Sequence, residues 1–327
     1  MSRYLSAELL RSRHTALQWL PLTALPLVGL TYNLAAFVNS RTDAVGVLMW
    51  QAVYLTGIAA PLTALFAAAA ENREKKSNYG GTLWLPLSRK RLRATRLGVI
   101  LLSLAIFHVL NFGGTWLLLT LSGRSGSERI AVLGLYAYIG TIGIAGLASA
   151  LTRLTNFLIT FLVFTAWQIV GITKPLVEGD HWWIWPMTWP VRLVLPILGV
   201  HQNAVPLEPG SPLNKESPAG ALILCGVLAL LGLIAATLTP ESWQVQKKKS
   251  PTVSPSTALK SAQFRPALLQ RTAARKPRPY SALTLAALTP TVRACLLLSI
   301  AALILCTLIY PILKRPGFSS ASFTALC

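Results

Sequence analysis

Residues 67–102 read AAAAENREKKSNYGGTLWLPLSRKRLRATRLGVILL, and they set the organisation of the whole chain. An alanine-rich apolar run gives way to charged residues at Glu71, and a second apolar run begins near Leu97. A helix needs about 20 mostly apolar residues to cross the hydrocarbon core of a membrane. This stretch is therefore typical of two consecutive transmembrane helices joined by a short, strongly basic connection.

Long apolar runs also fill the sequence on both sides of this stretch. Seven segments are long and apolar enough to span a membrane: 16–38, 44–70, 97–121, 131–151, 155–173, 219–239 and 292–313. Only 12% of the 327 residues are charged, whereas soluble domains carry about 25%. So little polar sequence cannot cover seven buried helices. A β-barrel would show alternating segments of about 10 residues, so we predict an all-α integral membrane protein.

The distribution of basic residues predicts how these helices are oriented. Short loops rich in Lys and Arg stay in the cytoplasm. The excess lies in residues 1–15, in the connection 71–96, at the turn with Arg153 and after residue 240, whereas segment 174–218 is balanced. The alternation predicts a multi-pass protein of the cell membrane with six spans and a cytoplasmic N-terminus. The net charge of +20 then points to membrane lipids as partners and not to nucleic acid.

Four parts of the chain differ in composition. Residues 1–15 mix leucines with arginines and predict an amphipathic helix in the cytoplasmic membrane interface. Residues 16–239 form the six-helix transmembrane domain. Residues 240–291 are rich in proline, serine and basic residues and predict a disordered cytoplasmic linker, because such a composition cannot bury a core. Residues 292–327 form a C-terminal apolar segment.

The apolar run 292–313 in that last part predicts a seventh span. A seventh span would place Cys327 outside the cell, whereas Lys314 and Arg315 favour the cytoplasmic side. Six and seven spans are therefore both open for the whole chain.

The segment expected on the outer face is rich in tryptophan. It contains Trp182, Trp183, Trp185 and Trp189 within eight residues, and its prolines break any helix. Tryptophan prefers the level of the lipid headgroups. We predict an irregular, partly inserted segment that helps to admit or release cargo; simple anchoring of a loop in the membrane is the alternative.

The sequence contains none of the common catalytic or nucleotide-binding motifs. No GxxxxGK[ST] phosphate loop, HExxH, GxSxG or dinucleotide-binding glycine pattern occurs, and the four cysteines lack metal-binding spacing. Acidic residues are few, none lies near the middle of a span, and none is predicted to pair between spans. Ion-driven carriers usually need such a group. We expect no enzymatic activity, no cofactor or metal on this chain, and no ion-driven transport.

The connection 71–96 resembles that of the permease subunits of ABC-2 type transporters. In that family an acidic residue ends the second helix, a short cytoplasmic helix and a proline follow, and a basic residue opens the third helix. Glu71 or Glu74, then Pro86 and Arg96, occupy these places here. The family usually has lysine where Arg96 stands.

Two further segments are similar to that family. Residues 8–13 read ELLRSR, like the family's N-terminus, and residues 71–80 read ENREKKSNYG, like the loop of its lantibiotic-immunity branch. The resemblance covers about residues 1–240, and the tail departs from it. It implies a six-helix ABC-2 type transmembrane bundle, to which the tail adds a seventh helix.

The resemblance also implies a mechanism. A separate ABC ATPase subunit would bind ATP and dock on the cytoplasmic connection, where Glu71, Glu74, Tyr79, Pro86 and Arg96 would form and orient the contacting helix. Two permease subunits, identical or related, would move against each other and expel an amphipathic compound, in the lantibiotic-immunity branch an antimicrobial peptide. The alternatives are a membrane scaffold or sensor that works through the basic linker, and a secondary carrier or membrane-embedded enzyme.

Overall fold

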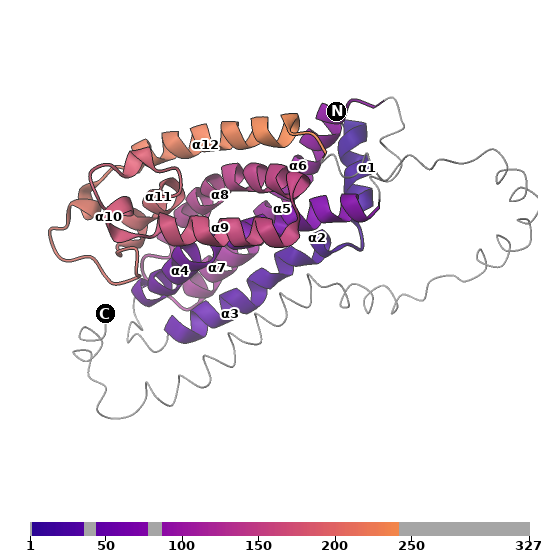
Figure 1. Ribbon diagram of the computed structural model, residues 1–327. Helices are drawn as coiled ribbons and strands as arrows, with labels where there is room; N and C mark the ends of the chain where they lie inside the picture. The colour runs from indigo at the N-terminus through magenta and orange to yellow at the C-terminus, as the bar shows by residue number, and fades with distance from the viewer. Residues whose placement is uncertain (1, 36–43, 78–86, 242–327) are drawn as a thin grey trace, which may run out of the picture.

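The computed structural model describes residues 2–35, 44–77 and 87–241, and within these ranges the protein is helical (Figure 1). The only strand-like pairing there is an isolated bridge between Val200 and Pro206. The prediction of an all-α protein is therefore confirmed for the described part of the chain. Tyr79, Pro86 and the segments beyond residue 241 lie outside the described residues.

The elements follow one another with short connections. In chain order they are α1 (Ser2–Ser12), α2 (Ala16–Trp19), a 3-10 turn (Leu20–Thr23), α3 (Ala24–Ala35), α4 (Val45–Gly57), α5 (Ala59–Lys76), α6 (Arg89–His108), a π-helical turn (Val109–Gly113), α7 (Gly114–Leu121), α8 (Glu128–Leu154), α9 (Phe157–Gly171), α10 (Lys174–Val177), a 3-10 turn (Trp182–Ile184), α11 (Trp189–Leu198), a 3-10 turn (Pro212–Lys215) and α12 (Ala219–Leu238).

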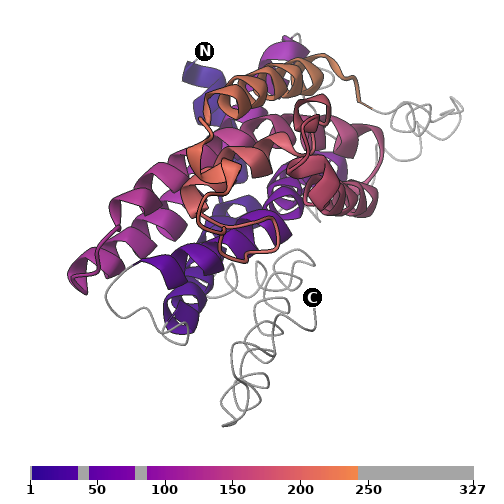
Figure 2. The same cartoon turned by 90° about the vertical axis from the view of Figure 1, so that its left-hand side faces the viewer.

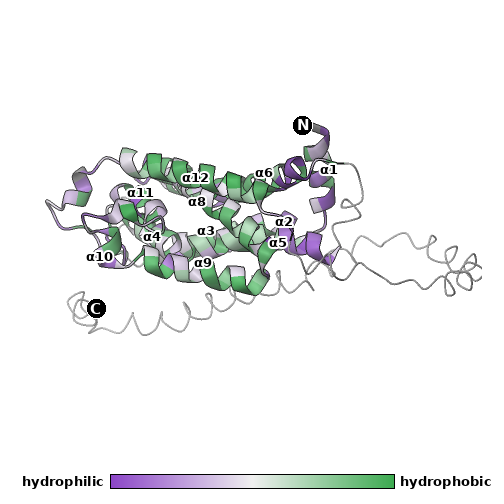
Figure 3. Ribbon diagram, turned by 45° about the horizontal axis from the view of Figure 1, so that its top comes forward, coloured by the Kyte–Doolittle hydropathy of each residue, from purple (hydrophilic) through white to green (hydrophobic). Residues whose placement is uncertain are grey.

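The longer helices lie side by side in an elongated bundle, with α1 across one end and α10 at the other (Figure 1). Seen from the end that carries α10, the orange α12 lies along one flank of the bundle (Figure 2). Hydropathy follows the same axis. Apolar residues cover the middle of the bundle, and hydrophilic residues gather at α1 and at the neighbouring ends of α5 and α6 (Figure 3).

Three helices among the described residues are long and apolar enough to cross a membrane: Arg89–Leu121, which joins α6 to α7, Glu128–Leu154 and Ala219–Leu238. A fourth is available if α4 and α5, which meet at a 56° bend, are taken as one span. These four correspond to the predicted runs 97–121, 131–151, 219–239 and 44–70.

Two predicted runs take a different form. Segment 16–38 is broken into α2, a 3-10 turn and α3, and Pro21 lies buried in the first positions of that turn. Proline supplies no backbone donor there, which favours the break. Segment 155–173 forms α9, a helix of only 15 residues.

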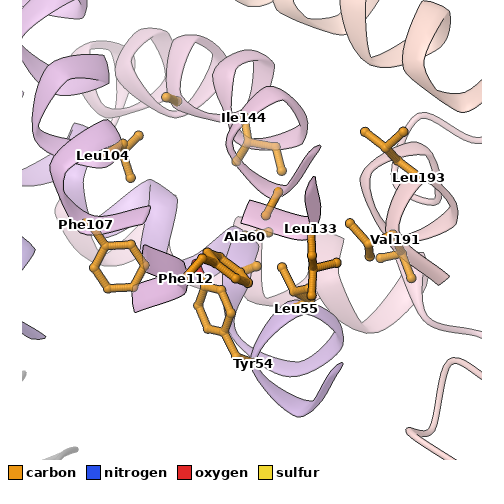
Figure 4. Close-up of a cluster of buried hydrophobic side chains, with 14 of the residues drawn as sticks. Tyr54, Leu55, Ala60, Leu104, Phe107, Phe112, Leu133, Ile144, Val191 and Leu193 are labelled. Carbon is orange, nitrogen blue, oxygen red and sulfur yellow. The ribbon is translucent and has the colours of Figure 1, made fainter. Parts of the chain in front are cut away.

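The hydrophobic core surrounds α8, which packs against α5, α6, α11 and α12. Aromatic rings fill the space between α4 and α6: Tyr54 lies 5.8 Å from Phe107 and 6.1 Å from Phe112, measured between ring centroids (Figure 4). Leu133 and Ile144 of α8 are almost fully buried in the same cluster. This packing fixes the middle of the bundle.

Close backbone contact joins α8 to α12. A Cβ atom added to Gly146 would lie 2.4 Å from the carbonyl group of Gly232, and one added to Gly143 would lie 2.6 Å from the backbone of Leu228. No side chain fits at such distances. The two helices therefore approach directly, as small residues allow between membrane helices.

A pair of buried amides joins α4 to the π-helical turn. Asn111 Nδ2 donates to Gln51 Oε1 at 3.2 Å, and Gln51 Nε2 donates to Asn111 Oδ1 at 3.4 Å and to Thr115 Oγ1 at 3.3 Å. All three side chains are fully buried. The amides satisfy each other in an otherwise apolar interior, as buried polar groups generally require.

A side chain from α9 holds the bend between α4 and α5. Gln168 Oε1 accepts a hydrogen bond from the Ala60 amide at 2.9 Å, and its Nε2 donates to the carbonyl groups of Leu55 and Thr56. In a continuous helix the Ala60 amide would donate to the Thr56 carbonyl group. The Gln168 amide takes the place of that bond, and an inserted side chain is an established cause of kinks.

We expect Gln168→Leu to lower the free energy of unfolding by about 1–3 kcal/mol, because it leaves one buried donor and two buried acceptors unpaired. Thermal unfolding in detergent measures the change. Thr165→Val is the matched control, since the Thr165 hydroxyl bonds only to a carbonyl group of its own helix. Equal effects of the two substitutions would show that Gln168 does not hold the bend.

Candidate functional site

Seven charged side chains gather at the end of the bundle that carries α1. This charge cluster consists of Glu8, Arg11, Glu71, Arg73, Glu74, Arg96 and Arg153. All three carboxylates are at least 97% buried. Burying a charge costs several kcal/mol unless it is paired and hydrogen-bonded. The contacts within the cluster therefore decide whether this end of the bundle is stable.

Glu71 lies at the centre of the contacts between α5, α6 and α8. Its Oε2 accepts a hydrogen bond from Arg96 Nη1 of α6 at 2.8 Å. Its Oε1 accepts one from the Ser149 hydroxyl of α8 at 2.6 Å, and Arg153 Nε lies 3.5 Å from the same oxygen. One carboxylate thus fastens three helices together.

Two further carboxylates tie α1 to this core. Glu74 Oε2 lies 2.6 Å from Arg11 Nη2 and 3.2 Å from Arg96 Nη2. Glu8 of α1 forms an ion pair with Arg73 of α5. The Oε1 atom of Glu8 also lies 3.7 Å from Arg96 Nε of α6. The N-terminal helix is therefore held to α5 and α6 by charge.

The same end of the bundle carries cationic caps on helix C-termini. Lys75 Nζ donates to the carbonyl groups of Thr152 at 2.6 Å and Thr155 at 2.7 Å, where α8 ends. Arg153 donates to the carbonyl groups of Ala236 and Thr239, where α12 ends. Cations stabilise helix C-termini because unpaired carbonyl groups and the negative end of the helix dipole lie there.

A second arginine and a carboxylate close the end of α12. Arg93 Nη1 donates to the Thr237 carbonyl group at 3.2 Å, and its Nη2 and Nε donate to the two carboxylate oxygens of Glu241 at 2.6 and 3.2 Å. Partial burial raises the pKa of Glu241, but the hydrogen bonds and charge of Arg93, with the Glu241 backbone amide, outweigh it and lower that pKa below its ordinary value. The start of α6 is thereby joined to the end of α12.

The structure brings together three of the five residues predicted to couple to an ATPase. Glu71, Glu74 and Arg96 share the charge cluster; Tyr79 and Pro86 lie outside the described residues. The helix α5 continues to Lys76, beyond the predicted run 44–70, so both carboxylates lie on a buried helix face. Their side chains are therefore not exposed to solvent.

The prediction that acidic residues do not pair between spans is wrong. Glu71 pairs with Arg96 and Arg153, which lie on two other membrane-length helices. Sequence analysis treated Arg153 as a loop residue that marks topology, yet it is completely buried. It also did not include Glu8 among the site residues, although Glu8 opens the segment ELLRSR.

At the opposite end of the molecule the four tryptophans form an aromatic cap around the 3-10 turn and the start of α11. Trp189 is buried and its indole nitrogen donates to the Trp183 carbonyl group at 3.0 Å. The Trp182 ring packs beneath the Arg192 guanidinium, 5.4 Å from ring centroid to Cζ. Trp183 and Trp185 are 54% and 41% exposed. Two tryptophans thus hold the segment, and two present their surface outward.

The apolar stretch 191–200, which follows the tryptophans, is too short to span a membrane. It forms most of α11, and Val191, Leu193 and Leu195 are buried against the bundle. Helix α11 packs on α8, α12 and α4. Arg192 pairs with Glu216 and donates to the Val177 carbonyl group at 3.0 Å, which fastens the neighbouring loops.

A histidine lies between two carboxylates in the loop after α11. His201 Nδ1 lies 3.0 Å from the Glu178 carboxylate, and its Nε2 lies 3.0 Å from Glu208. Partial burial lowers the pKa of His201, but the hydrogen bonds and charges of Glu208 and Glu178 outweigh it and raise that pKa above its ordinary value. The pKa of Glu208 is lowered by its own backbone amide and by His201.

Comparison with models of protein families, with characterised proteins and with solved structures finds no match for this chain. The charge cluster and the aromatic cap therefore have to be interpreted from their own geometry.

We expect Glu71→Leu to lower the free energy of unfolding by about 3–5 kcal/mol, because it removes the carboxylate partner of the buried Arg153 and one of the three carboxylates around Arg96. Thermal unfolding of the purified protein measures the loss. Glu128→Leu is the control: Glu128 is exposed in the first turn of α8, and its contribution there is about 0.3–1 kcal/mol. Similar losses for both substitutions would contradict a central role for Glu71.

The loop of His201 should loosen as the pH rises. A raised folded-state pKa means that the stabilisation is fully present below the unfolded value of about 6.5 and is lost as pH rises through the folded value. The contribution of Glu208, whose pKa is lowered, is present above about 4.3 and is lost as pH falls through its folded value. Both contributions are fully present between the two unfolded-state values, about pH 4.3 and pH 6.5, so the loop is most stable there.

Hydrogen exchange of the backbone amides of residues 199–208, corrected for intrinsic rates, measures this loosening. Between about pH 6 and pH 8.5 we expect more frequent opening in the unmodified protein and no pH dependence in His201→Gln. The control is His181→Gln, an exposed histidine of the preceding turn. An unchanged pH profile in His201→Gln would assign the effect to another group.

Proposed function

We propose that this chain is the permease subunit of an ATP-driven exporter of the ABC-2 type. In this proposal six spans cross the cell membrane, the N-terminus and the charge cluster lie on the cytoplasmic side, and the aromatic cap lies outside. A separate ABC ATPase supplies the energy, and a second permease subunit, identical or related, completes the transporter.

The charge cluster is the observation that carries this proposal. Helix α5 ends just before residues 78–86 and α6 begins just after them. The ATPase would dock on this connection. Below that connection, Glu71 and Glu74 of α5 share Arg96 of α6. A force applied to the connection would pass through these buried ion pairs to α8 and α1. Tight charge pairing at the base of a docking element suits transmission of movement better than it suits a passive scaffold.

Exposed cations flank the same connection. Lys76 at the end of α5 and Arg89, Lys90 and Arg91 at the start of α6 are exposed. Complementary charge speeds association and fixes the orientation of partners. These residues supply a basic surface for an acidic docking groove on the ATPase, and the buried cluster beneath them holds that surface in place.

The aromatic cap supports an amphipathic cargo. Trp183 and Trp185 present apolar rings with one hydrogen-bond donor each, a combination suited to the membrane interface. Trp189 and Arg192 hold the segment from behind. An amphipathic peptide resting in the outer leaflet would meet this surface first, and we include its export, as in lantibiotic immunity, in the proposal.

Charge reversal of the exposed cations tests the ATPase partner. We expect Lys76→Glu combined with Arg89→Glu to weaken co-purification of an ABC ATPase encoded beside this chain by at least about tenfold, or about 1.4 kcal/mol. The control is Arg129→Glu, an exposed arginine at the start of α8. Normal co-purification and normal ATP turnover in the double variant would refute the docking site.

Replacing the exposed tryptophans tests the cargo. Trp183→Leu with Trp185→Leu keeps apolar character but removes ring area and the indole donors. At equal expression we expect cells that carry this variant to become more sensitive to an amphipathic antimicrobial peptide, with little change in ATP turnover without cargo. Trp116→Leu, at a comparably exposed tryptophan of α7, should leave sensitivity unchanged. Unaltered sensitivity of the double variant would leave membrane anchoring as the role of the cap.

A further inference from the structure

A groove of about 580 Å³ separates the N-terminal segment from α6. Its buried floor is formed by Leu17, Pro21, Val99 and Ser103. Its exposed rims include Leu10 on one side and, among others, Leu102 and Ile106 on the other. The volume lies within the range of about 300–1,000 Å³ that is usual for small-molecule sites.

The helix α1 turns Glu8 toward the bundle and its leucines outward. Glu8 and Ser12 are buried against the bundle, whereas Leu5, Leu9 and Leu10 are exposed, Leu10 by 64%. A helix in water would have the opposite arrangement. Its outward face therefore needs an apolar environment, and Leu9 and Leu10 of that face line the groove.

The groove is mostly apolar along both α6 and the leucines of α1, and its charged residue is Arg13, in the turn after α1. Val99, Leu102 and Ile106 follow one face of α6 over seven residues, or about 10 Å, which is roughly two-thirds of one leaflet of hydrocarbon. Arg13 also lines the groove, is exposed, and has no ion pair or side-chain hydrogen bond within the described residues. An occupant must therefore combine a long apolar part with a negative charge.

We propose that this groove binds one anionic phospholipid, with an acyl chain along α6 and its phosphate beside Arg13. The inference rests on the membrane insertion proposed above, but on neither the ATPase nor the cargo. The lipid lies directly beside the charge cluster, because α1 contributes Glu8 and Arg11 to that cluster and Leu9 and Leu10 to the groove. The bound lipid would thus brace the helix that the ion pairs hold.

Native mass spectrometry of the full chain tests this proposal. The protein, purified in detergent, is exposed to phosphatidylglycerol or to phosphatidylcholine with identical acyl chains. We expect retention of one phosphatidylglycerol and a clear preference for it. Arg13→Gln should lower that preference about fivefold, the equivalent of about 1 kcal/mol per basic residue at a membrane surface. Arg91→Gln, at an exposed arginine of α6 outside the groove, is the matched control and should keep it.

A second variant separates the two parts of the site. Leu102→Trp narrows the groove from its exposed rim, so it should lower retention of both lipids and leave the preference between them unchanged. Thermal unfolding checks that each variant is folded. The proposal is overturned if Arg13→Gln prefers phosphatidylglycerol as strongly as Arg91→Gln does. It is also overturned if Leu102→Trp retains as much lipid as the unmodified protein.

The other possible occupants give distinct results. If a second copy of this chain fills the groove, the protein should be a dimer without bound lipid. If a segment of the same chain fills it, the protein should be a monomer whose lipid retention does not change in Arg13→Gln. Either result overturns the proposal. Alkaline carbonate extraction of membranes tests insertion separately. If carbonate extracts the chain from the membrane, both the proposed function and the lipid site are wrong. If the chain stays in the membrane but its lipid preference does not depend on Arg13, only the lipid site is wrong.

Discussion

The carboxylate of Glu71 is the contact on which the arrangement of the bundle depends. It meets Arg96 of α6 and both Ser149 and Arg153 of α8, and Arg153 extends the connection to the last turn of α12. Four helices far apart in the sequence are thus linked through one buried anion. Such a group is expensive to bury and strongly destabilising to remove, because the buried Arg153 would be left without its carboxylate partner. The geometry of this end of the molecule is fixed for that reason.

The middle of the bundle is held in another way. There the polar contacts are neutral amides: Gln168 replaces a helical hydrogen bond at the α4–α5 bend, and Gln51 pairs with Asn111 at the π-helical turn. The Gln168 contacts and the Gln51–Asn111 pair each lie where a helix departs from regular geometry. Each supplies hydrogen bonds to buried polar groups at that point. Neutral hydrogen bonds of this kind are worth about 1 kcal/mol each, far less than the loss of a buried charge pair. Loss of one side chain should therefore cost more stability at the charged end than at the two amide-linked breaks.

The sequence predicted the helical class and the runs that became α8, α12, the α6–α7 helix and the α4–α5 pair, because length and hydropathy are local properties. The prolines of segments 16–38 and 44–70 favoured a kink in each run, but they did not show where each break falls or that Gln168 would stabilise the one beside Gly57. Glu71, Glu74 and Arg96 were identified through a resemblance, while Glu8 and Arg153 were not, because pairing of residues up to 88 positions apart has no local signal. Arg153 in particular resembles any basic residue at the end of an apolar run. The exposure of Trp183 and Trp185 agreed with their sequence pattern, whereas the burial of Trp189 depended on tertiary packing.

The dependence of Arg153 on α12 sets a condition on how the protein is made. Arg153 binds the carbonyl group of Thr239, 86 residues later in the chain, and the glycine surface of α8 is covered by the same helix. At synthesis rates of about 5–20 residues per second, this arginine waits roughly 4–17 s before its last partner has been added. During that interval α8 carries a charge that is only partly paired and an uncovered backbone surface. Completion of α12 is therefore the step that closes the fold, and a nascent chain halted before it would present an incompletely assembled helix to the quality-control machinery of the cell.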